Sequence, residues 1–330
     1  MNDPGLRVRR SLAGISLLEL TIALCLGVTL SAALVTLYLA SKRSYVLDQQ
    51  LARLHESGRH AIDSVSRDLA MAGLYGGAAP GSLQLGPVDV GSCATGWALD
   101  TRTSLRVIGD YPGDTKATSR PAFLSCVEPA NVIPGTDLLA LKRTAGGAAV
   151  RYGELQRELQ GSTTRRWYLR LKAGAESSWQ QRSSTELAAM DVAADESYWR
   201  AVSRIYFVRP YSVSLGDGIP TLCAEELSGS LLAVRCLVEG VQDLQLEFGL
   251  DTDGDGLVDR FVDAAESLDL ADALVARIYL LMRSTAPVPG HRDTDDYRMG
   301  SKTVNGAGDG YVRYVVHTTV RLDARLHGLG

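Results

Sequence analysis

Four aspartates alternate with small residues in one short stretch of the chain. The stretch reads Asp251-Thr252-Asp253-Gly254-Asp255-Gly256-Leu257-Val258-Asp259. Ca²⁺ takes about six to eight oxygen ligands, and alternate aspartates around a turn can direct their carboxylates toward one point. Asp251, Asp253 and Asp255 match positions one, three and five of the twelve-residue calcium-binding loop. Gly256 stands at the position of the turn glycine, and Asp259 at position nine. The spacing therefore predicts a Ca²⁺ site.

The calcium loop is incomplete, because Val262 stands where the bidentate glutamate of position twelve is expected. Asp263 or Glu266 would have to supply the closing carboxylate. The flanking segments are also typical of strands, whereas this loop normally joins two helices. Aspartate and glycine are common in hairpin turns, so a solvated turn without a metal is the alternative. The sequence leaves both interpretations open, a Ca²⁺ site and a solvated turn.

No catalytic motif accompanies the aspartates. The five histidines show no H-E-x-x-H spacing, and neither G-x-S-x-G nor G-x-x-x-x-G-K occurs. We therefore expect no enzymatic activity.

A basic segment from Arg165 to Lys172 mixes arginines with aromatic side chains, as a DNA-binding groove does. Its apolar residues, Trp167, Leu169 and Leu171, alternate with the charges, which is typical of a half-buried strand. The formal net charge of −4 also argues against a general nucleic-acid binder, and the charged fraction of 22% against a disordered chain. We expect no specific nucleic-acid partner.

The N-terminal part of the chain carries one long apolar run, Ile15–Ala40, in which Glu19 is the one side chain charged at neutral pH. As a helix it would be roughly 39 Å long, enough to cross a bilayer core of about 30 Å. Three arginines, at positions 7, 9 and 10, precede the run, and Lys42 and Arg43 follow it. The positive-inside bias then predicts a single pass through a membrane, with the N-terminus cytoplasmic and the body outside the cytoplasm.

The start of this run, Gly14-Ile15-Ser16-Leu17-Leu18-Glu19, resembles the class III signal of type IV pilins and type II secretion pseudopilins. The resemblance implies that the membrane is the inner membrane and that the body is periplasmic. It also implies that a prepilin peptidase cuts after Gly14 and methylates the new N-terminus, Ile15. Glu19 then becomes the fifth mature residue. A carboxylate in a membrane helix is costly unless paired, and the resemblance supplies the free amine of a neighbouring subunit as its partner in assembly. The alternative is an ordinary signal anchor with one stray glutamate.

Beyond the run, the helical pattern continues to about Met71. Apolar residues recur every three or four positions from Leu47 to Ala72, and charged residues, Asp63 and Asp68 among them, fill the positions between. Gly73 and a glycine-rich stretch follow as helix breakers. We therefore divide the chain into a leader (1–14), the transmembrane half of one long helix (15–40), its amphipathic half (41–75) and a globular domain (76–330).

The remainder of the chain favours strands. The predicted strands are Asp137–Arg143, Arg166–Lys172, Ile205–Val208, Leu231–Leu237, Val241–Leu250, Val275–Arg283 and Tyr311–Asp323. Stretches rich in Gly, Ser, Pro and Asp, residues 110–121, 212–220 and 284–310, are predicted loops. A long helix followed by such strands predicts an α+β fold with a mainly antiparallel sheet.

Five cysteines are present. Cys25 lies inside the apolar run. The other four fall in the exported part, where an oxidising periplasm permits disulfides, and they allow three pairings. We favour Cys93–Cys126 with Cys223–Cys236, since each pair closes a local loop.

Three stretches in order, Arg67–Gly73, Leu237–Leu244 and Ala276–Ser284, resemble the PilW family of minor pilins, which is similar in role to the J-type pseudopilins. The resemblance implies a non-catalytic subunit that helps to prime and assemble a type IV pilus for motility, adhesion or DNA uptake. Its partners would be other minor pilins and the major pilin, and its final location the fibre at the cell surface. A type II secretion pseudopilin is the runner-up. From another class, the alternative is a membrane-anchored periplasmic enzyme or binding protein.

Overall fold

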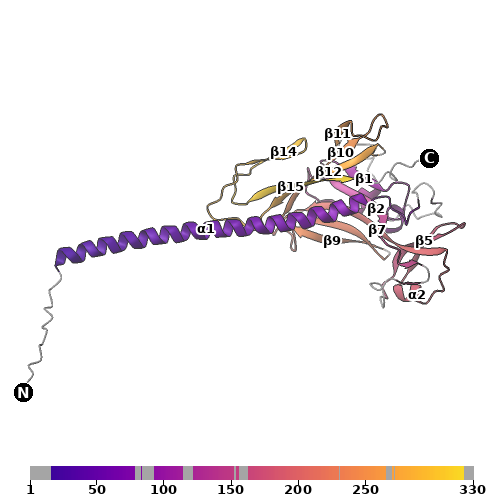
Figure 1. Ribbon diagram of the computed structural model, residues 1–330, viewed down its shortest axis with the longest axis horizontal. Helices are drawn as coiled ribbons and strands as arrows, with labels where there is room; N and C mark the ends of the chain where they lie inside the picture. The colour runs from indigo at the N-terminus through magenta and orange to yellow at the C-terminus, as the bar shows by residue number, and fades with distance from the viewer. Residues whose placement is uncertain are drawn as a thin grey trace, which may run out of the picture.

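The structure is a computed structural model that describes residues 16–78, 83, 93–113, 122–151, 154–155, 163–229, 231–264, 270 and 272–322. It consists of one long helix, α1, and a β-rich domain that packs on the C-terminal half of that helix (Figure 1). The fold is therefore α+β with mostly antiparallel strands, as the sequence predicts. Helix α1 runs over Leu17–Ala70, 54 residues, which corresponds to about 81 Å.

Helix α1 ends where the chain turns back onto the domain. Met71 takes the C-cap position, and Gly73 follows with φ of 77°, a conformation that glycine adopts without strain. The N–H of Gly73 donates to the carbonyl oxygen of Lys142 at 3.0 Å. The predicted helix end near Met71 is thus correct to within one residue, and the glycine joins the helix to a neighbouring strand.

The larger sheet contains nine strands and is organised around β7 (Glu196–Arg209). The others are β1 (Leu105–Ile108), β2 (Leu138–Thr144), β3 (Val150–Arg151), β4 (Glu154–Leu155), β5 (Arg166–Lys172), β6 (Ser178–Arg182), β8 (Thr221–Ser228) and β9 (Leu231–Glu239). One edge of β7 pairs with β2 and then β3, and the other edge pairs with β8 and then β5. The predicted strand Ile205–Val208 is only the end of β7, whose 14 residues carry too many successive buried positions to show a period of two.

The second sheet has the order β11-β10-β12-β15, with every neighbouring pair antiparallel. Its strands are β10 (Val241–Leu250), β11 (Arg260–Asp263), β12 (Ala273–Arg283) and β15 (Arg313–Arg321). The predicted loop 284–310 is wrong in part, because β13 (Asp296–Met299) and β14 (Lys302–Asn305) form a hairpin within it. Short segments complete the domain: α2 (Ser184–Ala188) and the helical turns Cys93–Trp97, Ala122–Cys126 and Pro129–Asn131.

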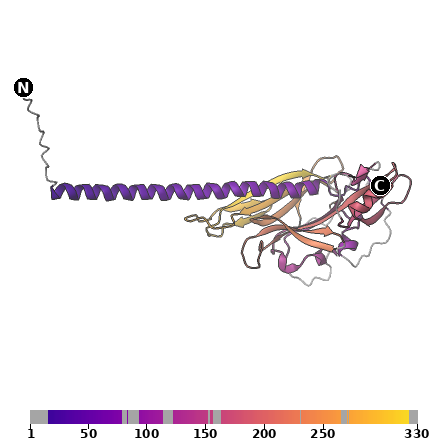
Figure 2. The same ribbon diagram turned by 90° about the horizontal axis from the view of Figure 1, so that it is seen from below.

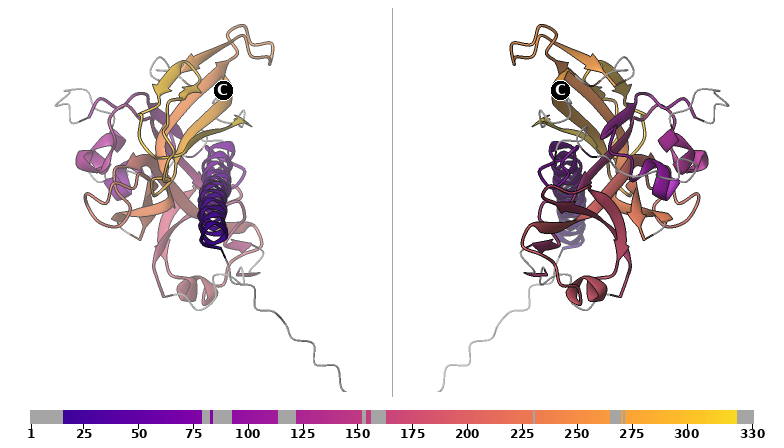
Figure 3. Two further views of the ribbon diagram at one scale, coloured as in Figure 1. Left: turned by 90° about the vertical axis from the view of Figure 1, so that its left-hand side faces the viewer. Right: turned by 90° about the vertical axis from the view of Figure 1, so that its right-hand side faces the viewer.

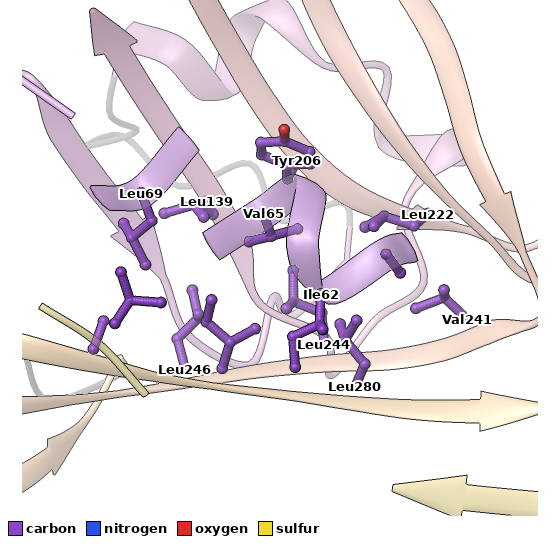
Figure 4. Close-up of a cluster of buried hydrophobic side chains, with 14 of the residues drawn as sticks. Ile62, Val65, Leu69, Leu139, Tyr206, Leu222, Val241, Leu244, Leu246 and Leu280 are labelled. Atoms are coloured by element: carbon purple, nitrogen blue, oxygen red, sulfur yellow. The ribbon is translucent and has the colours of Figure 1, made fainter. Parts of the chain in front are cut away.

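The C-terminal half of α1 lies between the two sheets, with β15 on one side and β9 on the other (Figures 1 and 3). Its apolar stripe, including Ile62, Val65 and Leu69, is buried. Figure 4 shows these side chains among those of both sheets. The labelled neighbours are Leu139, Tyr206 and Leu222 from the larger sheet and Val241, Leu244, Leu246 and Leu280 from the smaller one. The helix is therefore the middle of the main core.

Asp137 connects the two sheets from within. Its carboxylate accepts backbone N–H groups of Asp110 at 2.8 Å and of Leu246 at 2.7 Å. Burial raises the pKa of Asp137 to about 7, in spite of these two donors. The buried carboxyl group thus joins the β1 end of one sheet to β10 of the other.

Two disulfides stabilise the outer parts of the larger sheet. Cys93 bonds Cys126 and joins two helical turns, and Cys223 bonds Cys236 across β8 and β9. These are the two pairings favoured from the sequence. Cys25 is free and exposed on α1.

Candidate functional site

The N-terminal half of α1 extends away from the domain (Figures 1 and 2). Every residue from Ser16 to Tyr45 is exposed. The large apolar side chains include Leu17, Leu20, Ile22, Leu24, Leu26, Val28, Leu30, Leu34, Val35 and Leu37. In the part of the chain that the structure describes, α1 is the one helix long and apolar enough to cross a membrane. This half can therefore serve as a membrane anchor or as a packing surface for other apolar helices.

Three threonine hydroxyls on this half are satisfied within the helix itself. The hydroxyls of Thr21, Thr29 and Thr36 donate to backbone carbonyl oxygens three or four residues earlier, at 2.8 to 3.0 Å. Hydrocarbon offers no hydrogen-bond partner, so such internal bonds are what a lipid-exposed segment requires.

Glu19 lies in the first turn of α1. One of its carboxylate oxygens accepts the backbone N–H of Ser16, the N-cap residue, at 3.1 Å. A carboxylate at a helix N-terminus also interacts favourably with the helix dipole. The bond places the carboxylate beside the first described residue of the chain. Gly14 and Ile15, the predicted cleavage site, lie outside the described residues.

The other end of α1 is held by a buried ionic cluster. Asp68 is 2% exposed, and its carboxylate accepts from Arg143 of β2 at 2.6 Å and from Arg204 of β7 at 2.7 Å. The hydroxyl of Tyr206 donates to the same carboxylate at 2.7 Å. Burial by itself would raise the pKa of Asp68, but the two arginines hold it below its usual range. The cluster fixes the rotation of α1 about its axis and the position of α1 along the domain.

Between these ends, α1 approaches the smaller sheet closely at Gly58. A Cβ atom there would lie 3.2 Å from Met282 Cγ and 3.2 Å from Val316 Cγ1. One turn earlier, the ring of His55 lies 4.4 Å from that of Tyr314 on β15. Gly58 therefore allows the close packing of helix against sheet.

The acidic loop joins β10 to β11. Asp251, Asp253 and Asp259 each place one carboxylate oxygen within 4.8 Å of the others. Asp255 lies outside this group, and its carboxylate accepts the N–H of Leu257 at 2.8 Å. Three of the four predicted ligands are thus brought together.

Hydrogen bonds within the acidic loop shape it without a metal. Asp251 accepts from Gly254 at 2.6 Å and from Gly256 at 2.8 Å. Asp259 accepts from both the N–H and the hydroxyl of Thr252, and these bonds lower its pKa. Of the two candidates for the closing ligand, Asp263 accepts from Ser301 at 2.7 Å, and Glu266 lies outside the described residues.

The basic strand β5 uses most of its charges in ion pairs. Arg170 and Lys172 lie 2.5 Å and 4.0 Å from carboxylate oxygens of Glu196, and Arg165 lies 3.6 Å from Glu186. Tyr168 and Leu169 are both buried, and the other residues of β5 are half-buried or exposed, so β5 is a half-buried strand as the sequence predicts. These pairs leave little positive charge along β5 for a nucleic acid.

Comparison with known protein families found a match. Residues 205–324 match the family model of PilW, described as type IV pilus-assembly protein W. Over this C-terminal part, the chain is similar to the PilW family of type IV pilus assembly. Comparisons with curated proteins and with solved structures found no match.

The PilW match begins within β7 and ends just after β15. It thus includes β9 and β15, the strands on either side of the packed half of α1, and the acidic loop between β10 and β11. The exposed apolar half of α1, which lies outside the matched segment, is consistent with a pilus-assembly protein of the cell envelope. Asp68 fixes the C-terminal end of α1 on this domain through its bonds to β2 and β7.

Proposed function

We propose that this protein is a PilW-family minor pilin, a non-catalytic structural subunit that helps to prime and assemble a type IV pilus. The observation that carries the proposal is the division of α1. One continuous helix buries its C-terminal half in the domain and leaves its N-terminal half, Leu17–Ala40, apolar and exposed. Such a half-helix can pass from a bilayer into a bundle of similar helices, because both surroundings are apolar.

In this proposal the precursor crosses the inner membrane once, with its body in the periplasm. Prepilin peptidase cuts between Gly14 and Ile15, the new N-terminus is methylated, and other minor pilins and the major pilin pack against α1. The PilW match supports a pilus over a type II secretion system. A gene neighbourhood of secretion genes would favour the pseudopilin instead.

Glu19 provides the experiment that tests the assembly role. We expect Glu19→Ala to leave membrane insertion and cleavage intact and to reduce incorporation into the fibre strongly. An unpaired carboxylate in the membrane costs about 2.5–3.5 kcal/mol, so its removal should ease insertion. The reduced incorporation into the fibre would instead come from the missing ion pair with a neighbour's amine. The measurement is the amount of protein in the sheared fibre fraction relative to the membrane fraction.

The matched control is Glu56→Ala, which removes an exposed glutamate from the same helix outside the apolar half. It should incorporate as the wild type does. Normal incorporation of Glu19→Ala would count against the pairing and against assembly through this helix.

We also propose that the acidic loop binds Ca²⁺ through Asp251, Asp253 and Asp259, with Asp255 as a further candidate ligand. The convergence of three carboxylates supports this, because a divalent cation would relieve their mutual repulsion. Without the bidentate glutamate we expect weak binding, with a dissociation constant of about 10⁻⁴–10⁻³ M.

The Ca²⁺ proposal predicts a measurable stabilisation. At ten times the dissociation constant, Ca²⁺ should raise the free energy of unfolding by about 1.4 kcal/mol. Thermal unfolding of the detergent-solubilised chain in millimolar Ca²⁺ and in chelator tests this. Asp253→Ala should abolish the difference, and Asp191→Ala, a change at an exposed aspartate elsewhere, should keep it. Equal melting temperatures with and without Ca²⁺ would leave the loop as a solvated turn.

A further inference from the structure

One edge of β7 has a gap between its two neighbours. On this edge β8 pairs as far as Arg204, opposite Glu226, and β5 begins at Arg200, opposite Tyr168. Residues 201–203 therefore have no strand partner on this side, although β2 pairs with them on the other edge. The gap opens into a hollow of about 150 Å³. Its charged and aromatic lining residues are Arg166, Trp167, Arg200, Arg204, Glu226 and Arg235.

The charges around the hollow do not balance. Glu226 is the one carboxylate in the lining, and it lies 2.8 Å from Arg204 and 3.6 Å from Arg235. Arg204 also pairs with Asp68, which does not line the hollow, at 2.7 Å. Among the residues that the structure describes, nothing pairs with the guanidinium groups of Arg200 and Arg166. The hollow therefore has an excess of positive charge.

Arg200 is the most significant of these cations, because it is half-buried as well as unpaired. Burial, together with the neighbouring Arg166, lowers its pKa. A desolvated guanidinium without an anion is unfavourable, and guanidinium groups bind carboxylates through two parallel hydrogen bonds. The indole N–H of Trp167, in the same lining, is buried and has no hydrogen-bond acceptor in the described part of the chain. It is one more donor available to an anion.

We propose that this hollow is a binding site for a carboxylate side chain on an acidic segment of a neighbouring pilus subunit. The proposal rests on the proposed assembly function. The size of the hollow suits a single carboxylate group rather than a nucleic-acid backbone, which needs a continuous basic track. Among the described residues such a track is lacking, because Arg165, Arg170 and Lys172 are paired with glutamates, and the whole chain has a net negative charge. The anionic partner of this hollow is therefore an acidic protein surface rather than a nucleic acid.

The test uses the detergent-solubilised full chain and fluorescence anisotropy. The probes are a fluorescein-labelled hexaglutamate peptide and a labelled six-nucleotide oligothymidylate. We expect the peptide to bind, and Arg200→Ala to weaken it about tenfold or more, since a charge-assisted hydrogen bond is lost. Arg200→Lys should retain part of the affinity. Arg321→Ala is the matched control, because Arg321 is an exposed arginine on β15, and it should bind as the wild type does.

A second measurement guards against variants that fail to fold. A photo-crosslinking amino acid at Leu227, which lines the hollow, should capture another pilus subunit in assembling cells. Failure of the wild type to bind the peptide, equal binding by Arg200→Ala, or tighter binding of the oligothymidylate would each overturn the proposal. Peptide binding by the purified chain needs no fibre, so its failure is distinct from a failure of the Glu19 experiment.

Discussion

Replacing Asp68 with alanine is expected to lower the free energy of unfolding by about 3–5 kcal/mol, because it breaks a buried ion pair from one side. Arg143 is 8% exposed and would keep its charge without its partner carboxylate. The hydroxyl of Tyr206, also buried, would lose its acceptor. The loss would loosen the end of α1 from β2 and β7, so we expect the variant to assemble poorly as well.

The measurement is chemical unfolding of the full chain in detergent. Asp63→Ala is the matched control, since Asp63 is an exposed aspartate on the same helix, and it should change stability by less than about 0.5 kcal/mol. A loss below about 1 kcal/mol in Asp68→Ala would show that the cluster does not hold the helix.

The same cluster predicts a pH dependence. The folded-state pKa of Asp68 lies below its usual value, so its contribution is complete above the unfolded pKa of about 3.9. The contribution is lost as the pH falls through the folded-state pKa. The difference in stability between wild type and Asp68→Ala should therefore be constant near neutral pH and shrink below about pH 4.

The sequence predicts the parts of the fold that depend on local pattern. The apolar stripe of α1 is apparent from its spacing, and β5 and β10 have the predicted bounds, because each carries its own pattern of apolar residues. The favoured disulfide pairs also depend on short separations along the chain.

Sequence patterns do not reveal the features that are formed by residues far apart in the chain. The pattern along α1 groups Asp68 with the charges between the apolar positions, yet Asp68 faces the core and bonds residues 75 and 136 positions away. Its position three residues after Val65 and seven after Ala61 puts it on the buried stripe, which is the signal that could have revealed it. The hollow beside Arg200 depends on where β5 and β8 end along β7, and no local pattern contains that information.

The second large effect concerns Gly14. A bulky residue there, as in Gly14→Leu, is expected to block cleavage and so to abolish incorporation into the fibre. The uncut chain would keep its leader arginines and lack the free amine that Glu19 is proposed to pair with in a neighbouring subunit. Gly14→Ala should be processed in part, because alanine is also small. Immunoblots of membrane and sheared fibre fractions should show only the larger, membrane-retained precursor for Gly14→Leu, and both precursor and mature protein for Gly14→Ala.

The most direct test of the minor-pilin assignment is the intact mass of the protein extracted from membranes and fibres. We expect a chain that lacks residues 1–14, begins at Ile15 and carries one additional methyl group. An unprocessed chain as the stable, working form would contradict the assignment and return this protein to the class of membrane-anchored periplasmic proteins.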